Sequence, residues 1–293
     1  MKKSASLIIA TAILISNGYG QKVSGKLNFK KGEKIEVSSN TKSLISQEAM
    51  GQNIEFNMER NITEVYEILD VNANQTIVNH TIKRITLTMN GMGQTQSFDS
   101  DKKDTVEGKT ISPLQDALNK KYEATIDKQG TITTVKNTTV ESSKPAESTG
   151  DMIVNLLKML GPTIQLPTQP VQGEASLFRI MPAKELSKNE SWTDSTLTAD
   201  GKEITTYTLK DITPTDILID YTTQSTTSVK GDMMGMETTT NLVNKTKGNI
   251  IVDKTTGIIK QKTGNTESTG TVDMMGQSIP LTAKSTTTIN VKF

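Results

Sequence analysis

Apolar side chains recur at every second position along several stretches of this 293-residue chain. Ile54, Phe56 and Met58 form one such stretch, and residues 279–293 form the most regular one. A period of two places these side chains on one face of a β-strand. The chain also contains 45 threonines, whose β-branched side chains fit a half-exposed sheet surface. The sequence therefore predicts a mainly β fold, in which each sheet has an apolar face and a threonine-rich face in water.

Turn signals separate the alternating stretches. Asn72–Gln75, Asp127–Gly130 and Asp253–Gly257 contain Asn, Asp or Gly residues that adopt turn conformations easily. Four Met-Gly pairs lie between further stretches, as hairpin tips would: Met50-Gly51, Met92-Gly93, Met234-Gly235 and Met275-Gly276. Since such signals recur in both parts of the chain, we expect an antiparallel sheet built from two related, hairpin-rich halves.

Two short helices are expected between the strands. Residues 112–121 begin with Ser112-Pro113, a capping residue followed by a proline at the first helical position. Residues 151–160 carry an apolar stripe and are followed by Gly161-Pro162, which ends a helix. We expect these helices to pack on the concave face of the sheet or to cap one end of it.

The domain organisation follows from these elements. An N-terminal β half is expected at 21–140, a linker with the second helix at 141–190, and a C-terminal β half at 191–293. We expect residues 21–293 to form one continuous domain.

Residues 1–20 have the pattern of a secretory signal peptide. Lys2 and Lys3 precede an apolar stretch, and small residues precede a cleavage site between Gly20 and Gln21. No later stretch is long and apolar enough for a transmembrane helix, which needs about 18 residues. The sequence therefore predicts an exported protein, periplasmic or extracellular.

The residue counts exclude several classes of function. The chain has no cysteine, a single histidine (His80), 33 basic residues and 32 acidic residues. Disulfides, thiolate nucleophiles and histidine-cluster metal sites are therefore excluded, and near-neutral charge argues against nucleic-acid binding. No Gly-x-Ser-x-Gly motif accompanies His80, which we expect to be a packing or surface residue rather than a catalytic base. We expect a non-enzymatic protein with no catalytic residues, no metal and no cofactor.

Methionines cluster at the expected hairpin tips. Alternate tips of a meander lie at one end of a sheet, and flexible thioethers adapt to varied apolar partners. The candidate ligand-binding residues are Met50, Met92, Met233, Met234, Met236, Met274 and Met275. Two alternatives remain open: these side chains fill gaps beside the turn glycines, or Met233, Met234 and Met236 bind Cu(I).

Several short motifs carry a family resemblance. They are the Met-Gly-Gln tips, Met181-Pro182-Ala183-Lys184 leading to Ser191-Trp192, and 248–253 followed by Thr256-Gly257. Together they resemble an uncharacterised family of exported Bacteroidota proteins, a domain of unknown function. Many of those relatives look like lipoproteins, whereas no Cys follows the apolar stretch here. The layout is also similar to the curved half-barrel of periplasmic lipoprotein carriers. The resemblance implies a long, curved sheet and supplies no catalytic residues.

The expected function is non-enzymatic binding or carriage of an apolar ligand or envelope lipid. A structural or interaction protein of the cell envelope, without a ligand, is the alternative. A carrier needs a cavity of at least ~300 Å³, whereas a structural protein fills that space with side chains. An outer-membrane barrel is a further alternative because the last strand ends on Phe293, but 11 aromatic residues are too few for two girdles.

Overall fold

The computed structural model describes most of the chain downstream of residue 20. The described residues are 21–49, 52–91, 93–102, 117–118, 120–138, 169–198, 201–233 and 236–293.

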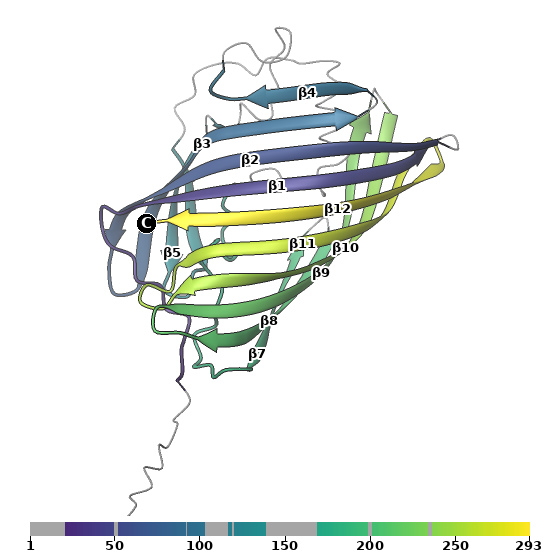
Figure 1. The fold of residues 1–293 in the computed structure, drawn as a ribbon. Helices are drawn as coiled ribbons and strands as arrows, with labels where there is room; N and C mark the ends of the chain where they lie inside the picture. The colour runs from purple at the N-terminus through teal and green to yellow at the C-terminus, as the bar shows by residue number, and fades with distance from the viewer. Residues whose placement is uncertain are drawn as a thin grey trace, which may run out of the picture.

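Twelve strands form one antiparallel sheet (Figure 1). The strands are β1 (Lys34–Ala49), β2 (Gln52–Val71), β3 (Gln75–Gly91), β4 (Gln94–Asp99), β5 (Lys121–Asp127), β6 (Ile132–Asn137), β7 (Ser191–Thr198), β8 (Gly201–Ile212), β9 (Asp216–Met233), β10 (Met236–Asp253), β11 (Ile259–Met274) and β12 (Gln277–Lys292). The predicted mainly β, antiparallel fold is confirmed.

The first and last strands pair in the middle of the sheet. The strand order is β6-β5-β3-β2-β1-β12-β11-β10-β9-β8-β7, and β4 pairs with β3. The central seam between β1 and β12 runs from the pair Glu36 and Lys292 to the pair Gln47 and Leu281. Pro280 comes next in β12, and because proline has no N–H it suits the point where this pairing stops. The sheet is strongly curved and, among the described residues, stays open between its edge strands β6 and β7 (Figure 1).

The strand ends that flank the four Met-Gly pairs lie at one end of the sheet. Gln47 pairs with Leu281, so the β1–β2 tip lies beside the β11–β12 tip. The pairing of Thr238 with Met274 adds the β9–β10 tip, and that of Phe56 with Gly91 adds the β3–β4 tip. We call this end the tip end. The turns at 72–74, 128–130 and 254–257 lie at the opposite end.

The two expected helices are only partly within the described residues. Ala117 and Leu118 are helical, but Lys121 already belongs to β5, so the predicted end at residue 121 is wrong. The alternating burial of β5 explains this end, because period-two packing replaces the helical stripe. Ala117 and Leu118 pack against buried residues of the inner face. Residues 151–160 lie outside the described residues.

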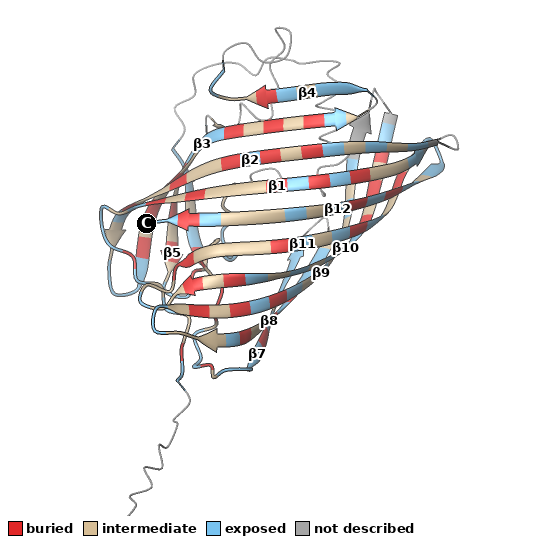
Figure 2. Cartoon of the chain, viewed as in Figure 1, coloured by how far each residue is buried: buried red, intermediate tan, exposed pale blue. Residues whose placement is uncertain are grey.

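Residues 21–33 cross the end of the sheet opposite the tips, and we call them the strap. Backbone hydrogen bonds tie Val23 to Leu186, Gly25 to Pro182 and Asn28 to Thr256. The strap and residues 169–190 cover one face of the sheet, which we call the inner face. Buried and less buried positions alternate along β1, β2 and β3 in Figure 2, because every second side chain points to this face.

Candidate binding site on the inner face

The inner face is apolar at both ends of the strands and polar between them. Near the strap, one cluster of buried side chains includes Phe29, Phe178 and Trp192. Near the tips, a second cluster includes Met58, Leu87 and Leu242. The polar band between them is unusual for the covered side of a sheet, where apolar residues normally continue along the strand.

One register of this band carries only hydroxyl side chains across six adjacent strands. We call it the hydroxyl row: Thr205, Thr223, Thr246, Thr266, Ser285 and Ser43, from β8 to β1. The side-chain oxygens form three pairs, at 2.9 Å between Thr205 and Thr223 and 2.8 Å in each of the other two. Neighbouring strands lie about 4.8 Å apart, so the row places a hydroxyl at each such step across the concave face.

The prediction that threonine lies on the water-facing side is wrong for this row. Thr205 and Ser43 are buried, and the pairing of each hydroxyl with its neighbour explains how the polar groups are accommodated.

The neighbouring register combines aromatic side chains with two glycines. Trp192 stacks on Tyr207 with ring centroids 5.2 Å apart, and Tyr207 lies 6.3 Å from Tyr221. Gly248 and Gly264 pair directly with each other on the next two strands. A Cβ atom on Gly264 would collide with the Tyr221 hydroxyl, and one on Gly248 would lie 2.7 Å from Cε1 of that ring. Tyr221 therefore lies across the two glycines, which a side chain at either position would prevent.

Two cations face the same region. The Nζ atom of Lys262 lies 4.8 Å from the centre of the Tyr221 ring, a cation–π contact. Burial lowers the pKa of Lys262, and the carboxylate of Glu203 acts in the opposite direction. Arg60 is buried and donates from Nη2 to the Thr41 hydroxyl at 3.1 Å. Burial lowers its pKa to about 10, against the effect of Glu64, so Arg60 stays protonated at neutral pH.

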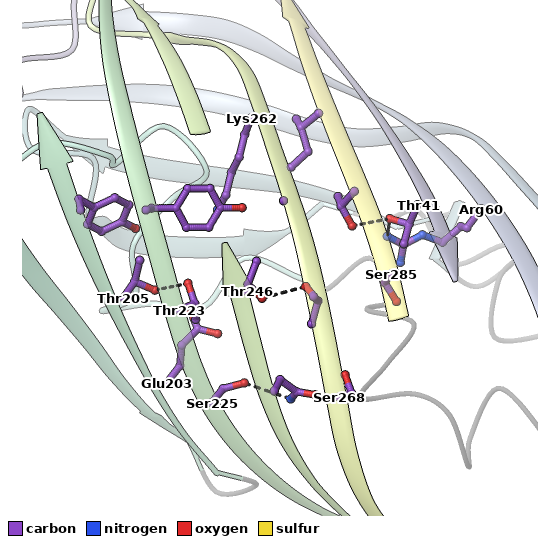
Figure 3. A pocket seen from close by; sticks show the side chains of 17 residues that line it. Thr41, Arg60, Glu203, Thr205, Thr223, Ser225, Thr246, Lys262, Ser268 and Ser285 are labelled. Atoms are coloured by element: carbon purple, nitrogen blue, oxygen red, sulfur yellow. Dashed lines mark hydrogen bonds between the residues drawn. The ribbon is translucent and has the colours of Figure 1, made fainter. Parts of the chain in front are cut away.

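These side chains surround a hollow of about 180 Å³, shown in Figure 3. Its wall includes residues of seven adjacent strands, which requires the inner face to be concave. Five members of the hydroxyl row, all except Ser43, contribute to it together with Arg60, Lys262 and Glu203.

A second hollow of about 650 Å³ adjoins the first one. Arg60, Thr287 and Ile289 belong to both walls. The second wall comes from β1, β2, β3, β5, β6 and β12 and from residues 169–177, which cover it. Most of the side chains in this wall are apolar: Val37, Ile62, Val78, Ala124, Ile126, Ile132, Pro170, Val171, Leu177 and Ile289 are among them.

His80 lies in the wall of the larger hollow. It is buried on the same face as Val78. Its Nε2 atom forms a hydrogen bond with Oε1 of Glu64 at 3.0 Å, and its ring stacks on that of Tyr66 with the centroids 4.6 Å apart. Its Nδ1 atom is buried without a hydrogen-bond partner among the described residues. Of the packing and surface positions expected for His80, the structure shows the packing one. Trp192 is also a core residue and donates from Nε1 to the Ile180 carbonyl at 3.1 Å.

The predicted methionine site is only partly visible. Met50, Met92 and Met234 lie outside the described residues, and for Met233 and Met236 only their backbone pairing is described. Met274 pairs with Gln277, and Met275 is 78% exposed with a φ of 52°. The strand ends that flank these methionines share one end of the sheet, but a ligand-binding or copper-binding role for them stays a prediction.

Sequence reasoning missed the polar site on the inner face. The signal for it was present: Thr205, Thr223, Thr246 and Thr266 each stand in phase with buried apolar residues of the same strand. In β9, for example, Thr223 lies two residues after the buried Tyr221 and four after Ile219. A polar residue in the apolar phase of a strand marks either an internal hydrogen-bond network or a binding site.

Within the part of the chain that the structure describes, no group of three or more His, Asp or Glu side chains is arranged to hold a metal ion. Among the same residues, no helix has the length and hydropathy to cross a membrane.

Comparisons with known proteins give one family and no characterised relative. No curated protein matches the sequence. A lipovitellin structure, described by its lipid–protein interactions, is 12% identical, with 91% of this chain and 26% of that chain covered and a TM-score of 0.45. The chain thus spans about a quarter of the length of that protein. An outer membrane channel from Pseudomonas putida F1 is 9% identical, with 91% and 98% covered and a TM-score of 0.21. Both TM-scores are too low to support a functional argument.

The sequence also matches a family whose description is "Family of unknown function", over residues 73–259. This match covers more than half of the chain and includes strands of both halves. The resemblance to an uncharacterised family is confirmed, whereas the Bacteroidota source and export stay predictions. The chain belongs to the family of unknown function DUF6263.

Proposed function

We propose that this protein is an exported, non-enzymatic binder or carrier of an apolar ligand such as an envelope lipid. The observation that carries the proposal is the 650 Å³ hollow on the inner face. Its volume exceeds the ~300 Å³ that a ligand of this kind requires, and it falls within the usual range of small-molecule sites. A purely structural envelope protein would fill this space with side chains.

The chemistry of the wall supports the same proposal. The apolar residues of the wall provide a surface from which water is released when an apolar ligand binds, at about 25 cal/mol per Å² of surface covered. Two polar members, Arg60 and Thr287, also belong to the wall of the smaller hollow and so mark the side where it adjoins. An apolar wall with a few convergent polar groups is the usual form of a ligand site.

Neighbouring serines on opposite faces of β1 provide a matched test. Ser39 lines the larger hollow, whereas Ser38 is not part of its wall. A phenylalanine at position 39 would occupy part of the hollow, so we expect Ser39→Phe to weaken binding of the apolar dye N-phenyl-1-naphthylamine at least fivefold. Ser38→Phe, which places the same ring on the other face, should bind the dye like the unmodified protein.

Two results would contradict the proposal. One is the absence of dye binding to the unmodified folded protein, and the other is equal dye binding by both variants. Native mass spectrometry of the protein from its own host provides a second measurement, in which we expect a co-purifying lipid mass.

Export has a separate test. The proposed cleavage predicts that the protein isolated from its host begins at Gln21. A protein that retains Met1 and remains in the cytoplasm would overturn this part of the proposal, without affecting the ligand site.

A further inference from the structure

We infer that the ligand is an anionic amphiphile, whose phosphate or carboxylate head lies in the smaller hollow against Lys262 and Arg60 and whose apolar chain occupies the larger one. This inference rests on the proposed function, because it assigns a chemical class to the ligand of the same site.

Lys262 is the strongest indication of an anionic partner. Its ammonium group lies over the Tyr221 ring and lines the smaller hollow. Among the described residues it forms no ion pair, whereas surface lysines of the same sheet do, such as Lys34 with Glu67 at 2.6 Å. Removing a cation from water is costly unless an opposite charge compensates it. An anionic head group in this hollow would supply that charge.

Arg60 places the head group at the junction of the two hollows. Its side chain belongs to both walls, and its hydrogen bond to Thr41 orients the guanidinium. A guanidinium binds phosphate or carboxylate oxygens through paired N–H donors. A head group held there leaves the apolar chain next to Ile62, Val78 and Ile289 in the larger hollow.

The hydroxyl row supplies further hydrogen-bond donors. In the Thr246–Thr266 pair, for example, one hydroxyl donates to the other, and the proton of the accepting hydroxyl remains able to donate to a ligand oxygen. Ser225 and Asn244 extend the polar wall in the next register. An anion with several oxygens can use these donors, whereas an alkane or a cationic head cannot.

The acidic groups of the site restrict where an anionic head group can bind. Glu203 lies at the β8 side of the smaller hollow, and Glu64 is engaged by His80 at 3.0 Å. An anion is therefore repelled from the Glu203 side and favoured between Lys262 and Arg60, on β11 and β2. The charge distribution orients the ligand as well as selecting it.

Three dodecyl amphiphiles with different head groups test the inference. Dodecyl phosphate, dodecyl maltoside and dodecyltrimethylammonium would compete with N-phenyl-1-naphthylamine, each below its micelle concentration. We expect dodecyl phosphate to displace the dye at a concentration at least tenfold lower than either of the others. Inorganic phosphate alone should not displace it, because it lacks the chain.

The variant Lys262→Met separates a binding role from a packing role. We expect it to remove most of the preference for dodecyl phosphate, to leave dodecyl maltoside binding unchanged, and to keep or raise the melting temperature. Lys247→Met removes the same charge from an exposed position of β10 and should preserve the preference.

The outcomes distinguish the inference from the proposed function. Equal displacement by all three amphiphiles, or an unchanged preference in Lys262→Met, overturns the anionic ligand and leaves an apolar-ligand binder. If Lys262→Met has a lower melting temperature and binds all three amphiphiles equally more weakly, Lys262 has a packing role, and the inference of an anionic ligand is again overturned. No displacement by any amphiphile overturns the proposed function itself.

Discussion

Tyr221 occupies a place that exists only because two residues of the neighbouring strands have no side chain. Gly248 and Gly264 leave the surface of the sheet open, and the ring of Tyr221 lies over them. A glycine inside a strand weakens it, since it packs nothing and loses more conformational freedom on folding. The aromatic ring offsets this weakness by covering the gap, and at the same time it presents its face to Lys262.

A methyl group at Gly264 tests this arrangement. We expect Gly264→Ala to lower the free energy of unfolding by about 1–3 kcal/mol, because the Cβ would collide with the Tyr221 hydroxyl. In a Tyr221→Phe background the colliding oxygen is absent, so Gly264→Ala should lower the free energy of unfolding by a clearly smaller amount. Urea unfolding of the four proteins measures both values, and an equal cost in the two backgrounds would contradict the account.

Two tyrosines of the site also make stability depend on alkaline pH. Burial, with smaller contributions from nearby carboxylates, raises the pKa of Tyr207 and of Tyr221 to about 12. Because these values lie above those of the unfolded chain, the stabilisation is complete below about pH 10 and is lost as the pH rises to about 12. A difference of two units corresponds to about 2–3 kcal/mol for each tyrosine.

The measurement is urea unfolding at pH 9 and pH 11.5. We expect the free energy of unfolding of the unmodified protein to fall between pH 9 and pH 11.5, and that of Tyr207→Phe to fall by a smaller amount. If Tyr207→Phe loses as much as the unmodified protein, Tyr207 ionises as easily in the folded state as in the unfolded chain.

At the level of strands, the hydroxyl row adds side-chain hydrogen bonds to the backbone pairing of six strands, which it joins in three pairs. Thr246 of β10 and Thr266 of β11 illustrate the energetics, with their oxygens 2.8 Å apart. Replacing one threonine by valine leaves the other hydroxyl without its partner in a half-buried site, which costs more than removing both. The pair is therefore expected to behave as a unit.

A double-mutant cycle measures this coupling. We expect Thr246→Val and Thr266→Val to cost about 1–2 kcal/mol each, and the double variant to cost less than their sum by at least 0.5 kcal/mol. Thr206→Val, at an exposed position of β8, should stay within about 0.5 kcal/mol of the unmodified protein. Additive costs for the pair would mean that the two hydroxyls are satisfied independently.

Strands and turns were predictable because their signals are local. The alternation in 279–293 and the turn residues at Asn72–Gln75 both act over a few positions, and the structure confirms the strands and the turn there. The inner polar band was not predictable in the same way. In β9 both phases of the alternation are polar from Thr222 to Ser228, so the pattern does not say which face is covered. Only the pairing with other strands determines this.

For the whole molecule, the strap joins parts of the chain that the sheet itself keeps apart. Its backbone contacts the turns after β5 and β10 and the segment before β7, at Lys128, Thr256 and Pro182. Phe29 adds an edge-to-face contact with Phe178, at 5.3 Å between ring centroids. These contacts bring the outer strands of both halves towards the inner face and help to hold the sheet in its curved form.

A shortened chain tests the contribution of the strap. We expect a protein that begins at Lys30 to keep its β-sheet circular dichroism but to melt at least 10 °C lower than one that begins at Gln21. The reason is the loss of Phe29 and Val23 from the buried apolar cluster near the strap, together with five backbone hydrogen bonds to the rest of the chain. An unchanged melting temperature would show that the strap lies on the sheet without stabilising it.

The position of the central seam could not be predicted from the sequence. β1 and β12 are each regular alternating strands, but their pairing joins positions such as Val37 and Val291, at opposite ends of the chain. No local signal carries that information, because either strand could pair equally well with several others of the same pattern. The hydroxyl row depends on the seam for Ser43 of β1, whereas its other four pairings join consecutive strands.

The seam has a consequence for the order in which the molecule is made. A ribosome produces β1 among the first strands and β12 last, yet these two strands are neighbours at the centre of the sheet. Until β12 leaves the ribosome, β1 and β11 each present a long open edge, and the inner face is divided between two separate pieces. Residues from both pieces, Arg60 and Lys262, form the wall of the smaller hollow. The smaller hollow therefore cannot take shape until β12 has paired with both β1 and β11.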